Sequence, residues 1–168
     1  MKTITFELSP KSVNKAIKEL EKYQNGLMGK LDMLMEQLAD IGIKEIRQND
    51  SPPGDSAPGQ AYSMVSVSND VARVDIIYEG TQVLFIEFGA GVHYNGQAGG
   101  SPHPKGAEFG YTIGSYGKGY GANDFWQYLD GNNNMVISHG TQAGMPVYKA
   151  SQKIRQDLVT IAQGVFGG

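Results

Sequence analysis

Any chemistry in this chain would depend on a few scattered side chains. Its three histidines are His93, His103 and His139, and Glu87 and Asp124 are carboxylates that could join them. The histidines lie ten and then thirty-six residues apart, a spacing that matches no helical ligand pair such as H-E-x-x-H. Cysteine is absent, which excludes disulfides, thiol catalysis and cysteine-ligated zinc. We therefore expect no metal ion.

The glycine-rich sequences lack a nucleotide-binding signature. The sequence FGAGVHYNG at residues 88–96 has neither the Gly-Lys-Ser/Thr ending of a P-loop nor the glycine spacing of a dinucleotide-binding unit. In GSYGKGYG at residues 114–121, Lys118 lies among glycines and tyrosines, but no helix N-terminus follows directly to bind an anion. We therefore expect no nucleotide and no other cofactor.

The support for an enzyme is equally unspecific. Ser138 and His139 are adjacent, and neighbours on an extended chain point to opposite faces. No Gly-x-Ser-x-Gly sequence is present to hold a nucleophile. We expect a protein without catalytic activity. The alternative is a hydrolase that uses Glu87, Asp124 and a histidine of the glycine-rich region.

A second alternative is a single-stranded nucleic-acid binding module. Aromatic residues alternate with glycines in this region, and aromatic side chains can stack on bases when a basic groove lies beside them. Only Lys105 and Lys118 provide positive charge there, and the whole chain has a net charge of −3. We therefore expect the aromatic residues to pack a core instead. The module would use Tyr111, Tyr116, Tyr120 and Trp126.

Length and composition indicate a single domain over residues 1–168. Domains usually have roughly 100–200 residues, and 40% hydrophobic against 18% charged residues allows a core to form. The N-terminal sequence has no sustained apolar segment of a signal peptide, and no stretch is long enough to span a membrane. We expect a Pro/Gly-rich mobile loop at residues 48–60 and a Gly-rich extended loop at residues 89–123.

A long amphipathic helix is predicted from Pro10 to Arg47. The Ser9 side chain can accept a hydrogen bond from a free backbone N–H of the first turn. Pro10 suits the first turn because it has no N–H that would need an acceptor. Apolar residues recur at steps of three and four, with Gln24 in the missing position, and form a narrow heptad-like stripe. The helix can pack only on its own sheet, or also against a neighbouring subunit. The stripe comprises Val13, Ile17, Leu20, Leu27, Leu31, Leu34, Leu38 and Ile41.

A β-hairpin is predicted after this helix. The sequences AYSMVSVS at residues 61–68 and VARVDIIY at residues 71–78 are rich in strand-forming residues. They are joined at Asn69-Asp70, two residues that tolerate the positive φ of tight hairpin turns. Arg73 and Asp75 would face solvent or a partner. The side chains expected to face the core are those of Val74, Ile76 and Tyr78.

The remaining elements are short, apart from a second helix. KTITFEL at residues 2–8 and MVISHG at residues 135–140 predict strands, whereas TQVLFIEF at residues 81–88 suits either a buried strand or a short helix. The last helix is expected within residues 143–166, with Pro146 in its first turn. The fold class is α+β, with both helices packed on a small, mostly antiparallel sheet. The core face of the last helix would consist of Val147, Ala150, Ile154, Leu158 and Ile161.

Two short blocks lie on either side of the glycine-rich region. FIEFG contains Phe85, Glu87, Phe88 and Gly89, and MPVYKA at residues 145–150 opens the last helix. In this order the features resemble the tail-completion or neck proteins that join head to tail in long-tailed bacteriophages and prophages. The resemblance covers roughly residues 80–161 and the general shape of the N-terminal half. The chain departs from the family where SPPGDSAPGQAYS replaces a common Pro-x-x-Thr-Gly-x-Leu segment.

The resemblance implies a non-enzymatic virion structural protein at the head–tail junction. Such a protein forms a homo-oligomeric ring, a hexamer, and contacts other head–tail connector and tail proteins. It assembles in the host bacterial cytoplasm, remains in the virion, meets no membrane and meets DNA only as passing cargo. A mild negative charge suits this role, because a basic lumen would hold the DNA. A minor capsid or tail component of a prophage is the alternative within this class.

The resemblance also implies structural roles for some residues and contacts with other subunits for others. Glu87 is expected to have a packing or capping role, and Pro146 and Ala150 to set the start of the final helix. We also expect residues 89–121 to be mobile in the free protein and ordered by a neighbouring subunit or tail protein. The candidate interface residues are Gln24, Leu27, Leu31 and Leu34 of the long helix and His93, Tyr94, Tyr116 and Tyr120 of the glycine-rich loop.

Overall fold

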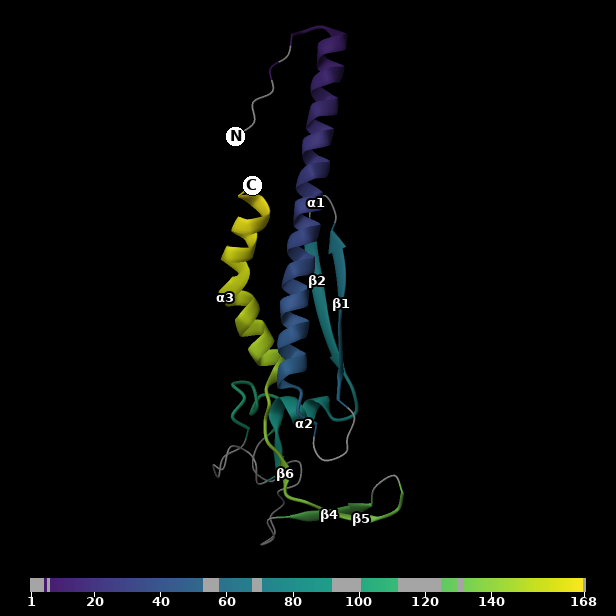
Figure 1. The fold of residues 1–168 in the computed structure, drawn as a ribbon, viewed down its shortest axis with the longest axis vertical. Helices are drawn as coiled ribbons and strands as arrows, with labels where there is room; N and C mark the ends of the chain where they lie inside the picture. Colours follow the sequence, from purple (N-terminus) through teal and green to yellow (C-terminus); the bar gives the residue numbers. More distant parts are fainter. Residues whose placement is uncertain are drawn as a thin grey trace.

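One long helix forms the axis of an elongated molecule (Figure 1). The computed structural model of the chain describes residues 5, 7–52, 58–67, 71–91, 101–111, 125–129 and 132–167. The elements in order are α1 (Pro10–Asn49), β1 (Gln60–Val67), β2 (Ala72–Glu79), α2 (Val83–Phe88), β3 (Ala90–Gly91), β4 (Trp126–Leu129), β5 (Met135–Ser138), β6 (Gly140–Thr141) and α3 (Pro146–Phe166). α3 lies along one side of α1 and the β1–β2 hairpin lies along the other. The fold is therefore α+β, as predicted.

α1 begins where the sequence predicted. The side chain of Ser9 accepts a hydrogen bond from the backbone N–H of Ser12 at 3.3 Å, and Pro10 occupies the first turn. The helix ends at Asn49, two residues beyond the predicted end at Arg47, because the side-chain amide of Asn49 still donates to the Glu45 carbonyl at 2.9 Å. The predicted loop at residues 48–60 is therefore shorter, since β1 also takes its last residue.

The β1–β2 hairpin packs its inner face on the C-terminal half of α1. The strands are antiparallel, with Ala61 opposite Tyr78 and Val67 opposite Ala72. Tyr78 and Ile76 pack on buried Ile46 of α1, which confirms that they face the core. The predicted turn at Asn69-Asp70 lies outside the described residues. On the other face, Arg73 and Asp75 form an exposed ion pair at 2.8 Å.

α3 packs on α1 through a narrower row of side chains than the sequence predicted. Ile154 and Ile161 contact the cluster of Leu34, Leu38 and Val165 that joins the two helices. Ala150 is buried at the other end of the helix. The prediction was wrong for Val147 and Leu158, which are both exposed, because the contact between the helices buries only part of the predicted apolar face.

The N-terminal half of α1 extends past the end of α3 and past the β1–β2 hairpin (Figure 1). Within the described part of the chain, the apolar stripe of this N-terminal half is not packed on a sheet. The prediction that the helix packs only on its own sheet is therefore wrong for this half. Ile17 is 47% exposed and Leu20 is 55% exposed, and Leu27 is exposed as well. Leu34 and Leu38 in the other half are buried. Ile17, Leu20 and Leu27 of the stripe therefore remain about half exposed, whereas Leu34 and Leu38 do not.

The short elements lie at the opposite end of α1. The ambiguous sequence at residues 81–88 forms the helix α2, and β3 pairs with β6. β4 and β5 pair with each other as an antiparallel hairpin, which includes the predicted strand at residues 135–138. Residues 101–111 fold into consecutive turns, so the predicted loop at residues 89–123 has structure at both its start and its centre. The strand predicted at residues 2–8 lies largely outside the described residues.

At Gly42, α1 packs closely against both β2 and α3. A Cβ at this position would overlap Cδ1 of Ile76 and lie 2.9 Å from Cδ1 of Ile154. We expect Gly42→Val to lower the free energy of unfolding by about 1–3 kcal/mol, because it overpacks the core. The matched control is Gly29→Val on the same helix, where no atom lies within 4 Å of the added Cβ. Its change should stay within about 0.5 kcal/mol. Urea denaturation measures both, and equal losses would contradict the packing described.

Candidate functional site

The two blocks that flank the glycine-rich region meet in space. α2 ends at Gly89, which has a φ of +77° and whose N–H donates to the Phe85 carbonyl at 2.7 Å. A Cβ at Gly89 would lie 3.0 Å from the backbone of Thr141 and of Ala143. The N–H of Gly144 donates to the Ile86 carbonyl at 2.7 Å. The end of α2 is therefore held directly against the segment that leads into α3.

Glu87 caps the N-terminus of α3 from a distance in the sequence. Its Oε2 accepts from the N–H of Val147 at 2.8 Å, and its Oε1 accepts from the N–H of Tyr148 at 2.9 Å. The local cap residue, Met145, has a left-handed backbone with a φ of 53° and makes no side-chain cap. The first N–H groups of a helix need acceptors, and a carboxylate there is favoured by the helix dipole. The predicted capping role of Glu87 is confirmed.

His103 completes this site. Its Nε2 lies 3.1 Å from Oε1 of Glu87, and both side chains are buried. Its Nδ1 accepts a hydrogen bond from the N–H of Lys105 at 3.0 Å. An accepting Nδ1 carries no proton, so Nε2 holds the ring proton and donates it to the carboxylate. Both nitrogens of the ring and both oxygens of Glu87 are engaged.

An aromatic cluster holds His103 in place. Phe88 stacks on Tyr111 with ring centroids 4.5 Å apart, and it meets the edge of the His103 ring at 4.5 Å. Tyr148 meets the other side of the imidazole at 5.3 Å. The side chain of Ser101 donates to the Phe88 carbonyl, and its N–H donates to the Tyr111 carbonyl at 3.0 Å. The centre of the glycine-rich region is thus packed on its own chain, contrary to the expectation that it is ordered by a neighbour.

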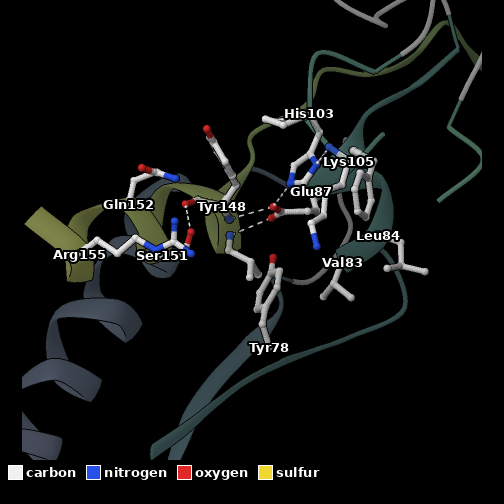
Figure 2. A pocket seen from close by; sticks show the side chains of 13 residues that line it. Tyr78, Val83, Leu84, Glu87, His103, Lys105, Tyr148, Ser151, Gln152 and Arg155 are labelled. Atoms are coloured by element: carbon white, nitrogen blue, oxygen red, sulfur yellow. Dashed lines mark hydrogen bonds and ion pairs between the residues drawn. The ribbon is translucent and has the colours of Figure 1, made fainter. Parts of the chain in front are cut away.

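A hollow of about 530 Å³ opens beside the capped helix (Figure 2). Leu84 of α2 and Val147 of α3 line it and are exposed, and Lys105 and Arg155 provide two cations. The oxygens of Glu87 already accept hydrogen bonds from α3 and His103. The hollow therefore presents apolar surface and positive charge, and it presents no unengaged carboxylate from Glu87.

Tyr78 reaches this region from β2, and its hydroxyl end points toward the start of α3 (Figure 2). The hydroxyl of Tyr78 and the Oδ1 of Asp50 are both buried, and neither has a partner within hydrogen-bond geometry among the described residues, although the two groups interact. Burial raises the pKa of the Tyr78 phenol above its ordinary value of 10.0, and the nearby carboxylates of Asp50 and Glu87 raise it further. The neutral form of the phenol is therefore strongly favoured in the folded protein.

The predicted structural residues all belong to this site or to its supports. Phe85, Glu87, Phe88 and Gly89 form α2 and its end, and Pro146, almost fully buried, starts α3. Sequence reasoning missed His103 as the partner of Glu87. The loop between the two residues contains several glycines, so the sequence does not indicate the direction in which the imidazole points. The remaining structural residue, Ala150, packs in the cluster of Ile46 and Ala61.

The predicted interface residues have different surroundings. Leu34 lies in the buried cluster between α1 and α3, so it belongs to the chain's own core. Leu31 is half-buried, whereas Leu27 and Gln24 are exposed. The other predicted interface residues lie outside the described residues, and these are His93, Tyr94, Tyr116 and Tyr120.

The described residues give little support to the two alternatives, a hydrolase and a single-stranded nucleic-acid binding module. Tyr111 is buried, so it cannot stack on a base. Asp124 lies outside the described residues, and its proposed partner Glu87 is engaged as a helix cap. Within the part of the chain that the structure describes, no group of three His, Cys, Asp or Glu residues could hold a metal ion.

We expect Glu87→Ala to lower the free energy of unfolding by about 3–5 kcal/mol, because it leaves a buried imidazole N–H and two helix N–H groups without an acceptor. Glu87→Gln keeps an acceptor oxygen and should lose less. The control is Asp157→Asn, which removes the exposed ion pair with Lys153 and should cost less than about 1 kcal/mol. Chemical denaturation at pH 7 compares the three. An Ala variant as stable as the control would contradict the capping role.

Tyr78→Phe should leave stability at pH 7 within about 1 kcal/mol of wild type, because the lost hydroxyl has no hydrogen-bond partner. The raised pKa stabilises the fold while the phenol is neutral, and this contribution is lost as the pH rises above 10.0 toward the folded pKa. The wild type should therefore lose stability more steeply above pH 10.0 than Tyr78→Phe does. The exposed control Tyr23→Phe should follow the wild-type curve, and a Tyr78→Phe curve parallel to it would refute the assignment.

Comparison with known proteins adds no relative from which a role could be transferred. No family model, no curated protein and no solved structure matches the chain. Among the described residues, none of the helices is both long enough and apolar enough to cross a membrane.

Proposed function

We propose that this chain is a non-enzymatic structural protein of a long-tailed bacteriophage or prophage, located at the head–tail junction. It acts in tail completion or as a neck protein, and its subunits form a ring. It assembles in the host bacterial cytoplasm with other connector and tail proteins and remains in the virion. The proposal starts from the resemblance of the blocks at residues 85–89 and 145–150, which meet in the folded chain through Glu87 and the start of α3.

The observation that carries the proposal is the half-used stripe of α1. Leu34 and Leu38 of the stripe are buried against α3. The same three- and four-residue spacing continues to Leu20 and Ile17, which are about half exposed. An apolar heptad stripe of this kind is stable in water when a second helix covers it. A neighbouring subunit supplies such a helix without any further component.

The state of the buried polar groups also favours a structural role. A catalytic carboxylate or histidine needs an atom that can reach a substrate. Both oxygens of Glu87 accept backbone hydrogen bonds, and both nitrogens of His103 are engaged. These two residues support the N-terminus of α3, which is a structural role.

Energetics indicate that the stripe is one part of a larger contact. Fully burying a Leu or Ile side chain contributes about 1.5–3 kcal/mol. Ile17, Leu20 and Leu27 are already about half buried, so each contributes less than this. Association costs an estimated ~4–15 kcal/mol in translational and rotational freedom, plus side-chain ordering. Burying these three side chains therefore contributes less free energy than association costs. A stable ring consequently needs a second contact surface.

Leu20→Glu tests the proposed contact. A glutamate keeps helix propensity but places a charge on the stripe, so we expect a normally folded monomer where the wild type forms a ring. Lys22→Glu on the same helix is the control, because Lys22 is exposed and lies off the stripe. Mass in solution at several concentrations and negative-stain images of any oligomer measure the outcome.

The same variants test the location. A prophage that lacks this gene should release separate heads and tails on induction, and the wild-type gene and Lys22→Glu should restore joined virions. Leu20→Glu should not restore them. A wild-type chain that stays monomeric at every concentration, or a deletion that leaves virions joined, would sink the proposal.

A further inference from the structure

The β4–β5 hairpin exposes one apolar face. Leu129 lies opposite Met135 and Gln127 lies opposite Ile137, so these four side chains share a face of the hairpin. Met135 is 62% exposed and Ile137 is 57% exposed, and Leu129 is exposed to a similar degree. The burial alternates along β5, with Val136 and Ser138 on the less exposed face. The hairpin therefore presents the apolar side chains of Leu129, Met135 and Ile137 to solvent.

Two features indicate that the β4–β5 hairpin can pair with a further strand. Among the described residues its strands pair only with each other, and an isolated two-stranded hairpin is marginally stable at best in water. Residues 125–129 and 132–138 contain no charged side chain. Edge strands of soluble proteins usually carry charges, prolines or bulges that prevent pairing with other chains. In Figure 1 the hairpin projects from the α2 end of the molecule, away from α1 and α3.

β1 is a second strand of this kind. In the described part of the chain it pairs only with β2, which leaves its other edge without a strand. Residues 60–67 contain no charge and no proline. Tyr62 and Met64 are exposed on the outer face. The side chain of Arg47 donates to the Ala61 carbonyl at 3.3 Å, so the edge available for pairing begins at Tyr62.

We propose that the β4–β5 hairpin of one subunit adds to the free edge of β1 in the next subunit. This pairing gives a four-stranded sheet across the interface, which exceeds the three strands that independent stability requires. Each chain carries one β4–β5 hairpin and one free β1 edge. Head-to-tail addition therefore pairs both of them in every subunit of a closed ring. A different protein seated on either edge would leave the other edge unpaired. The inference rests on the proposed ring, to which it adds the second contact surface.

The absence of cysteine allows a direct test by cross-linking. Met64→Cys on β1 and Ile137→Cys on β5 place single thiols at exposed positions. One variant carries a fused tag, so that a mixed dimer differs in size from either homodimer. A flexible bis-maleimide longer than the inter-strand spacing of about 4.8 Å is added to each variant alone and to the mixture. We expect cross-linked dimer in the mixture and none in either variant alone.

Controls make every outcome informative. Val159→Cys on the exposed face of α3, mixed with Ile137→Cys, reports random collisions and should give no dimer. Tyr62→Cys with Met135→Cys is a second pair, which replaces the first if either variant misfolds. Dimers of Met64→Cys alone would show that β1 edges pair with each other, and dimers of Ile137→Cys alone would show that hairpins pair. Either result overturns the inference.

The failure of this inference differs from the failure of the proposed function. A ring detected by mass and imaging, with no mixed cross-link from either pair, overturns the sheet between subunits and leaves the ring in place. A chain that is monomeric at every concentration overturns both. A mixed cross-link that persists in Leu20→Glu at high concentration would support the hairpin contact independently of the α1 stripe.

Discussion

The start of α3 is the constraint on which the rest of the structure depends. Pro146 fixes the first turn, and Met145 before it has a left-handed backbone and makes no side-chain cap. The first N–H groups of α3 are part-buried and need acceptors from elsewhere in the chain. Glu87 supplies two of them from α2, sixty residues earlier in the chain. A carboxylate at this position also interacts favourably with the dipole of the 21-residue helix.

Placing that carboxylate determines the surrounding structure. α2 must end at Gly89, because a side chain there would meet the backbone of Thr141 and Ala143. The remaining capacity of the buried carboxylate is taken by His103, which brings residues 101–111, including Tyr111, against Phe88. A buried charge without these partners would cost several kcal/mol. The site is consequently polar inside, and the hollow beside α3 presents apolar surface together with Lys105 and Arg155.

The sequence predicted those features that depend on local rules. Ser9 and Pro10 identified the start of α1, and alternation identified the β1–β2 hairpin. For Glu87 the resemblance implied only a local packing or capping role, and that it caps a helix sixty residues later was not predicted. Which half of the α1 stripe is buried could not be predicted, because periodicity identifies an apolar face and does not identify where its partner ends. The pairing of Glu87 with His103 was equally hidden, since it depends on the path of a glycine-rich segment.

The apolar surfaces that remain exposed lie at opposite ends of the molecule. The free stripe of α1 is at one end, and the β4–β5 hairpin is at the other, beyond α2 (Figure 1). A symmetric dimer could cover the stripe and leave both hairpins and both β1 edges exposed. Head-to-tail contacts cover a different surface on each side of a subunit, so they account for several unpaired surfaces in one chain. Such an arrangement closes into a ring when the rotation between neighbours divides a full turn without a rise along the axis, and otherwise it forms an open helical filament.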